Sequence, residues 1–296
     1  MGYGQHQSFY LRDRWLNKAI KHLQRDNRFF YDKEAFEKMG LGKNMVQSLR
    51  YWVVATGVVS EDYNEERKKI YEITPFGNIV FKYDKFIKFQ DTASIIHYHM
   101  CKESEPSTAW FWFFNILNET IISKDELLEK FIAWVKENEE KEISTNSLKK
   151  DIECLVKLYS AKQENIDPEE VIQSPLNKLS LVSEKRGMVY KKSLSSKEVG
   201  LTALMYVLLD FRRRFEIENI TVDELVTHEG LWGRVFNMAR STIVDALEQL
   251  SHHLKYPVKF TRTNNLDTIR IPEADPLEFL FDEYVRKVEK CNGVKN

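Results

Sequence analysis

The sequence predicts a mainly helical protein with small β wings, built as three tandem winged helix-turn-helix-like units. One order of elements (helix, short helix, amphipathic third helix, β hairpin) occurs three times without sequence identity. The length of 296 residues and the hydrophobic share of 43% suit two or three domains, each with its own core. We therefore expect units at residues 1–90, 91–195 and 196–296.

The first unit contains the most informative segment, a predicted third helix over residues 42–56. Its apolar side chains recur at helical spacing and predict one buried stripe of Met45, Val46, Leu49, Trp52 and Val53. The opposite face is expected to carry Lys43, Asn44, Gln47, Ser48 and Tyr51. Gly57 should end this helix, and a hairpin with a polar tip at 62–69 should follow. An amphipathic helix over 9–23 and a short one from Asp32, its predicted cap, to Met39 are expected before it.

The second unit is expected to begin with an aromatic helix that starts at Ser107. Ser123 is a predicted cap for a helix over 124–138, and Ser144 or Thr145 should start the third helix. The apolar stripe of that helix is Leu148, Ile152, Leu155, Val156 and Tyr159. A turn-rich connector includes residues 165–168, and strands at 178–182 and 188–192 are expected to form a hairpin.

The third unit repeats this order. Its predicted elements are a buried helix over 199–215, a helix over 222–227 capped by Thr221, a third helix over 241–252, strands at 258–261 and 268–271 flanking Asn264 and Asn265, and a closing helix from Pro276 to about residue 290. The stripe of the third helix is Ile243, Leu247, Leu250 and Leu254.

Charge is unevenly distributed along the chain. The net charge is −1, but residues 1–90 carry +5, residues 91–195 carry −4 and residues 196–296 carry −2. This asymmetry indicates that the first unit faces a polyanion and that the later units face something else.

The three predicted third helices differ in charge in the same way as the units that contain them. The first has no carboxylate between residues 40 and 60. The second mixes Lys149 and Lys150 with Asp151 and Glu153, and the third is expected to expose Asp245 and Glu248 beside Arg240. Carboxylates in a DNA groove would meet phosphate repulsion, so the later two are predicted to be dimerisation or partner surfaces.

We therefore expect double-stranded DNA to bind to the first unit. The residues expected to enter or flank the major groove are Lys43, Asn44, Gln47, Ser48 and Arg50, and those expected at the wing tip are Arg67, Lys68 and Lys69. Two alternatives stay open: a protein-interaction scaffold without DNA binding, and a transcriptional regulator of its own operon.

No motif indicates catalysis or a cofactor, so a non-enzyme is expected. The Gly-Leu-Gly-Lys stretch ending at Lys43 fails the phosphate-loop pattern, because Glu37 replaces the first glycine and Asn44 replaces the hydroxyl. His97, His99 and Cys101 do not share a helix face and are interpreted as linker or core and not as metal ligands. The aromatic run 110–114 favours burial over a partner groove, and the arginines 212–214 favour the helix dipole over DNA.

A cytoplasmic location is expected. The sequence has no run of about 18 apolar residues and no signal-like N-terminus. Its three cysteines, Cys101, Cys154 and Cys291, are scattered, which is typical of reduced thiols.

Several motifs, in order through nearly the whole chain, resemble one family. The opening contains Gly4, His6, Phe9, Leu11, Arg12, Trp15, Leu16 and Lys18. The later matches are Gly42 to Val46 with Arg50, Tyr51 and Trp52, then Ser174, Pro175 and Leu176 with Leu179 and Val182, and Gly233 to Phe236. Together they are similar to the 4007 family of domains of unknown function.

That resemblance implies a bacterial protein that accompanies DNA phosphorothioation systems in defence against phage. It implies no known activity. The sequence departs from the family's Gly-His-Glu opening at Gln5 and Gln7. For His6 and Arg12 two interpretations stay open: anchoring of the N-terminus against the first unit by His6 and Phe9, with Arg12 paired to a carboxylate, or a phosphate or partner contact beside the Lys43 helix.

Overall fold

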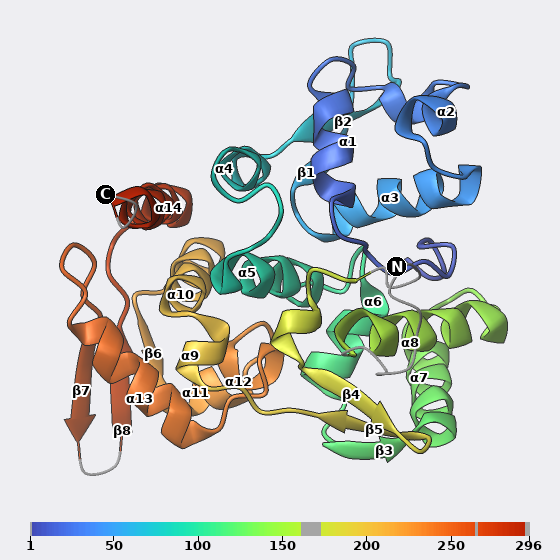
Figure 1. The fold of residues 1–296 in the computed structure, drawn as a ribbon. Helices are drawn as coiled ribbons and strands as arrows, with labels where there is room; N and C mark the ends of the chain where they lie inside the picture. Colours follow the sequence, from blue (N-terminus) through green and yellow to red (C-terminus); the bar gives the residue numbers. More distant parts are fainter. Residues whose placement is uncertain (1, 161–172, 264–265, 294–296) are drawn as a thin grey trace.

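The computed structural model describes residues 2–160, 173–263 and 266–293. It is 55% helix and 11% strand with small antiparallel sheets, which confirms the mainly helical prediction (Figure 1). The predicted connector at 165–168, the hairpin tip at Asn264 and Asn265 and the side chain of Cys291 lie outside the described residues. None of the described helices is both long and apolar enough to cross a membrane.

The first unit contains the predicted third helix and hairpin close to their expected bounds. Its elements are α1 (Trp15–Leu23), η1 (Phe29–Tyr31), α2 (Ala35–Met39), α3 (Lys43–Ala55), β1 (Val59–Tyr63), β2 (Lys69–Ile73) and α4 (Pro75–Tyr83). Gly57 has φ +73° just after α3, a conformation that ends a helix at little cost for glycine. The predicted start of α1 at residue 9 is wrong, because Arg14, inside the predicted range, has a left-handed φ of 64° that an α-helix does not accommodate, and the helix begins after it. Asp32 does not cap α2, which has Glu34 at its N-cap.

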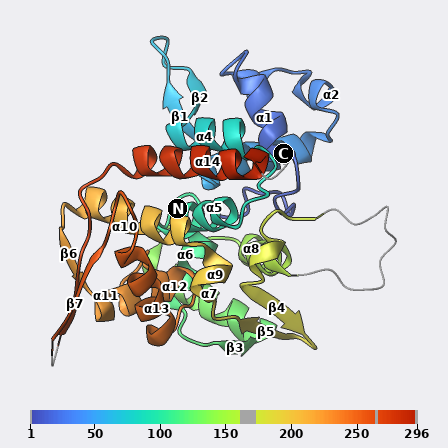
Figure 2. The ribbon, with the colours of Figure 1, turned by 60° about the vertical axis from the view of Figure 1, so that its left-hand side comes forward.

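The next helix, α5 (Gln90–Cys101), is buried on almost every side. Sequence periodicity did not predict it, because a helix without a solvent face has no polar stripe. Its central position between the units is visible in both views (Figures 1 and 2).

The second unit follows the predicted order with one extra strand. Its elements are α6 (Thr108–Phe111), the π-helix η2 (Trp112–Ile116), β3 (Ile121–Ser123), α7 (Lys124–Asn138), α8 (Thr145–Tyr159), η3 (Asn177–Leu179), β4 (Val182–Lys185) and β5 (Met188–Lys191). The Ser123 cap is confirmed, since its side chain accepts a hydrogen bond from the Glu126 N–H. The predicted strand at 178–182 is wrong, because η3 and the left-handed Ser180 occupy most of it.

The third unit has the same order. Its elements are α9 (Ser196–Val199), α10 (Leu201–Phe215), β6 (Asn219–Thr221), α11 (Val222–Thr227), α12 (Trp232–Val235), α13 (Arg240–Ser251), β7 (Lys259–Thr263), β8 (Leu266–Arg270) and α14 (Pro276–Gly293). The Thr221 cap is confirmed as a capping box with Glu224. Gly200, with φ +95°, separates α9 from α10, so the predicted single helix over 199–215 is wrong. Leu254 lies beyond α13 and is 95% exposed, so it does not belong to the buried stripe.

The sheets distinguish the first unit from the other two. The strand orders are β3-β5-β4 and β6-β8-β7, so in both later units the strand before the second helix pairs with the last strand of the hairpin. In the first unit the sheet is only β1-β2. A single backbone hydrogen bond of 2.9 Å from the Tyr71 N–H to the Asn27 carbonyl lies where the third strand would be.

One continuous hydrophobic core joins the three units. His97 on α5 lies at the junction of the later two, 2.7 Å from the Tyr159 hydroxyl through Nδ1 and 2.6 Å from the Val235 carbonyl through Nε2. The carbonyl can only accept, so Nε2 carries the proton and Nδ1 accepts from Tyr159. The closing helix α14 packs back against α10 and α4, which links the third unit to the first (Figure 2).

Candidate nucleic-acid interface

The exposed side of α3 presents three of the predicted DNA contacts. Lys43, Asn44 and Gln47 are exposed, and Arg50 is half-buried further along the same stripe. The Lys43 ammonium lies 5.0 Å from the centre of the Phe36 ring, which supports its stem and leaves the charge at the surface. The first two turns of α3 are therefore open to a partner.

The other side of α3 is covered by the N-terminal segment, residues 2–14. Ser48 is fully buried and its hydroxyl donates to the Phe9 carbonyl at 3.2 Å, and the indole N–H of Trp52 donates to the same oxygen at 2.9 Å. Tyr51 is buried as well. The assignment of Ser48 and Tyr51 to the exposed face was therefore wrong, because sequence periodicity does not show which segment packs across a polar face.

The tip of the β1-β2 hairpin, the predicted wing, offers fewer unpaired charges than the sequence suggested. Lys68 is paired with Glu66 at 2.6 Å and Lys69 with Glu61 at 2.7 Å. Arg67 is exposed at the tip and forms no ion pair with any residue that the structure describes. Lys69 starts strand β2 and faces a pocket, so it is not a tip residue.

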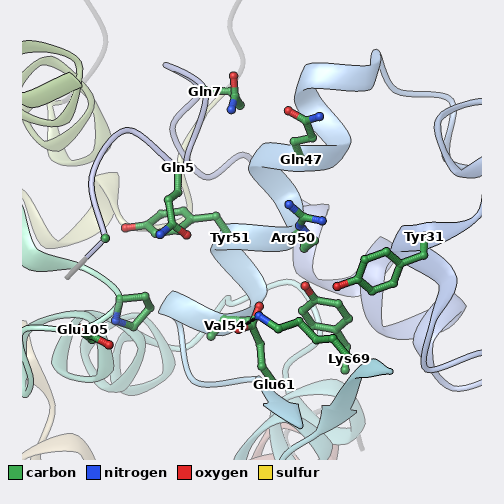
Figure 3. A pocket seen from close by; sticks show the side chains of 13 residues that line it. Gln5, Gln7, Tyr31, Gln47, Arg50, Tyr51, Val54, Glu61, Lys69 and Glu105 are labelled. Carbon is green, nitrogen blue, oxygen red and sulfur yellow. Dashed lines mark hydrogen bonds and ion pairs between the residues drawn. The ribbon is translucent and has the colours of Figure 1, made fainter. Parts of the chain in front are cut away.

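A pocket of about 550 Å³ opens beside the C-terminal half of α3 (Figure 3). Five parts of the chain line it: the N-terminal segment, η1, α3, the hairpin of β1 and β2, and the loop after α5. The lining residues are Gly2, Gln5, Gln7, Tyr31, Gln47, Arg50, Tyr51, Val54, Glu61, Lys69, Tyr71, Glu105 and Pro106. In Figure 3 Arg50 projects from α3 between Tyr31 on one side and Gln5 and Tyr51 on the other.

Several polar groups in this pocket have no protein partner within the described part of the chain, and the three glutamines among them are exposed. Neither the Arg50 guanidinium nor the side-chain amides of Gln5, Gln7 and Gln47 form a hydrogen bond or ion pair there, although Arg50 lies 6.0 Å from the centre of the Tyr31 ring. Burial and a hydrogen bond with Tyr31 raise the pKa of Tyr71, so this phenol stays neutral at physiological pH. The pocket is polar, with a cation available in its centre.

His6 holds the N-terminal segment against the second unit. It is fully buried, and its Nε2 lies 2.7 Å from the Asp151 carboxylate, which also accepts the Gly4 N–H at 3.0 Å. The His6 ring lies 6.2 Å from that of Trp52. His6 thus anchors the N-terminus by its ring contact with Trp52 of the first unit, as expected, and also by its bond to Asp151 of the second unit.

Arg12 is placed differently from the expected ion pair. Its guanidinium lies 5.3 Å from the ring centres of both Phe9 and Trp15, and its buried Nε has no hydrogen-bond partner among the described residues. Arg12 thus packs on aromatic rings, and a phosphate or partner contact by this residue stays a prediction.

A second basic surface lies on the first unit and was not singled out from the sequence. A groove of about 590 Å³ is lined by Lys21 on α1 and by Lys82, Lys85 and Lys88 around the end of α4. These four lysines form no ion pair with any described residue. Lys21 lies on the exposed face of α1, whose buried face packs against α3. The regular Lys-x-x-Lys-x-x-Lys spacing from 82 to 88 was the available signal.

The other side-chain clusters singled out in the sequence are buried or bonded to other residues of the protein. His97 lies in the core with Cys101, as predicted, and no three potential metal-ligating side chains come together in the described ranges. Arg213 pairs with Asp210 at 2.9 Å, Arg214 with Glu103 at 2.8 Å, and Arg212 donates to the Ile271 carbonyl at 3.0 Å. Of residues 110–114, all but Phe111 are buried.

A family model described as a protein of unknown function, DUF4007, matches residues 3–284. The chain belongs to this family. No curated protein matches the DUF4007 chain significantly. Among solved structures, it is similar to SspB and to magnesium ion-bound SspB, each with a TM-score of 0.83 and 20% identity over 95% of this chain and 86% of SspB. At this identity the likeness establishes a shared fold.

Proposed function

We propose that this DUF4007 protein is a non-catalytic DNA-binding and adaptor subunit of a bacterial phosphorothioation-type DNA-modification system that acts in antiphage defence. The observation that carries the DNA-binding part is the surface of α3. Lys43, Asn44 and Gln47 are exposed on its first turns, and no carboxylate occurs between residues 40 and 60. Such a face can approach phosphates and base edges without repulsion.

The strand orders support a winged helix-turn-helix interpretation of the units. In the second and third units a helix, a strand, further helices (α7 and α8, or α11, the short α12 and α13) and a hairpin follow in order, and the first strand pairs with the last. The first unit has the same helices and hairpin. In such units the third helix enters the major groove with its N-terminal residues. This corresponds to the exposed end of α3, with Arg67 on the wing reaching a neighbouring phosphate.

The place of this protein in a modification system rests on its family and on its fold. The fold it shares with SspB covers 95% of the chain, and the family resemblance implies phosphorothioation systems. The second and third units would then hold other subunits.

The magnesium ion of one SspB structure does not extend to a metal role here. No trio of His, Cys, Asp or Glu side chains gathers among the described residues. In the pocket beside α3, the Glu61 carboxylate is already bonded to Lys69. The donor set of the described residues does not fit a divalent cation.

Fluorescence anisotropy of labelled duplexes, plain and phosphorothioated, tests the proposal. We expect binding that weakens steeply with salt, with a log–log slope of about −3.6 for about four neutralised phosphates. Lys43→Ala should weaken binding, and Lys149→Ala, which removes an exposed lysine from α8, is the matched control. Binding of neither duplex at low salt would contradict the proposal and favour an adaptor that never contacts DNA.

A further inference from the structure

The exposed stripe of α3 leads into the pocket. Lys43, Gln47, Arg50 and Val54 follow each other at helical spacing, from the open first turn to the pocket wall. Gln47 belongs to both, because it is exposed on the helix and also lines the pocket. A DNA strand lying along α3 would therefore reach the pocket without leaving the protein surface.

Arg50 gives the pocket its chemical preference. Its guanidinium is half-buried and has no carboxylate partner among the described residues. The Glu61 carboxylate on the same wall is bonded to Lys69 at 2.7 Å. A guanidinium without a carboxylate partner presents a fork of N–H donors that matches the oxygens of a phosphate.

Tyr31 gives the pocket a flat wall. It is 42% exposed, and the Arg28 guanidinium lies 4.8 Å from its ring centre. Arg28 also donates to the Lys69 carbonyl at 2.6 Å, which fixes the wing beside this ring. An exposed aromatic ring next to a guanidinium is a common stacking platform for an unpaired base.

Three glutamine side chains surround the same space. Gln5 and Gln7 come from the N-terminal segment and Gln47 from α3, and within the described chain their amides are unbonded. Each amide offers a donor and an acceptor, as a base edge requires. The buried contact between His6 and Asp151 fixes the segment that carries Gln5 and Gln7.

We propose that this pocket binds a single unpaired nucleotide. Its phosphate lies on Arg50, its base lies against Tyr31, and the glutamine amides bond the base edge. The volume of about 550 Å³ is typical of small-molecule sites. The ligand chemistry is shared by a nucleotide within a DNA strand and by a free mononucleotide. Binding of a nucleotide within a DNA strand rests on the proposed DNA-binding function, whereas binding of a free mononucleotide does not.

The test compares three probes with the full chain. They are a duplex with one bulged 2-aminopurine nucleotide, the same duplex fully paired, and free adenosine monophosphate. We expect the bulged duplex to bind about tenfold more tightly than the paired one, with a fall in 2-aminopurine fluorescence as the base stacks. Arg50→Gln and Tyr31→Ala should each abolish this preference. Lys43→Ala, on the same helix but outside the pocket, should weaken both duplexes equally.

The other outcomes separate the two proposals. If wild-type protein binds both duplexes equally without a fluorescence change, or if the preference survives in either pocket variant, the pocket proposal is overturned and the DNA-binding proposal stands. If neither duplex binds but adenosine monophosphate binds in an Arg50-dependent manner in calorimetry, the pocket stands as a mononucleotide site and the DNA-binding proposal fails. If no probe binds, both are overturned.

Discussion

Helices α3 and α13 hold equivalent places in their units and present opposite surfaces. Each precedes an antiparallel hairpin and buries one apolar stripe. On the other side, α3 exposes Lys43 and Gln47, whereas α13 exposes Asp245 and Glu248. Helices in corresponding positions of two units thus present surfaces of different charge, so function must be argued from the exposed residues of each unit.

The corresponding helix of the second unit shows that a charge in the sequence is not always a surface charge. Asp151 on α8 was counted among the charges that would meet a partner, yet it is 3% exposed and bonded to His6 and to the Gly4 N–H. Arg240 on α13 is likewise used internally, with Asp223 and with Asp267 at 3.4 Å. A charge count overstates what such helices offer to a partner.

The largest expected effects are losses of unfolding free energy from changes in the buried apolar stripes, which α3 and α13 have in common. Trp52 on α3 and Leu247 on α13 are both fully buried, and Trp52 also donates to the Phe9 carbonyl. Trp52→Ala should cost about 3–5 kcal/mol and Leu247→Ala about 2–5 kcal/mol of unfolding free energy. Lys43→Ala and Glu248→Ala, on the exposed faces, should each change it by less than about 0.5 kcal/mol. Urea unfolding measures all four, and equal losses at buried and exposed positions would refute the assigned faces.

A smaller effect is expected from acid at the junction between the later units. Burial lowers the pKa of His97 to about 4, below its usual value of 6.5. Between these two pKa values the unfolded state binds more protons than the folded state. The contribution of neutral His97 to the unfolding free energy is therefore fully present above pH 6.5, and about 3 kcal/mol of it is lost as the pH falls toward 4. Unfolding of wild-type protein and His97→Gln across this range tests it. An unchanged pH slope in the variant would assign the acid sensitivity to another group.

A change on α3 and its counterpart on α13 test the difference between the two surfaces. Gln47→Glu places a carboxylate on the exposed face of α3 and should weaken duplex binding about tenfold, because it adds phosphate repulsion and removes a donor to base edges. Glu248→Gln on α13 should leave affinity unchanged. Anisotropy titrations at one salt concentration suffice. An equal effect of both changes would mean that DNA does not distinguish the two helices.

Local signals made much of the fold predictable. The Ser123 and Thr221 caps, the apolar stripe of α3 and the hairpin after Gly57 depend on residues within a few positions of each other. The first strands of the later sheets, β3 and β6, are only three residues long and acquire their identity from pairing with distant strands. Helix α5 was missed because it is buried on nearly all sides.

The candidate site was only partly predictable. Lys43, Asn44, Gln47 and Arg50 could be found from the face of one helix. Ser48 could not be judged, because the segment that covers it is held by Asp151, more than 100 residues away. The pocket combines residues that are spread from Gly2 to Pro106 along the chain. No spacing in the sequence predicts that Tyr31 lies beside Arg50.

The most direct test of the central claim compares two basic surfaces of the same unit by the salt dependence of duplex binding. The double variant Lys43→Ala, Arg67→Ala removes two charges from the α3 face and wing, and Lys82→Ala, Lys85→Ala removes two from the groove beside α1. If duplex DNA lies on α3, the first variant should lower the magnitude of the log–log salt slope by about 2 and weaken binding uniformly, whereas the second should leave both unchanged. A loss confined to the groove variant, or the same loss in both, would contradict the assignment of DNA binding to α3.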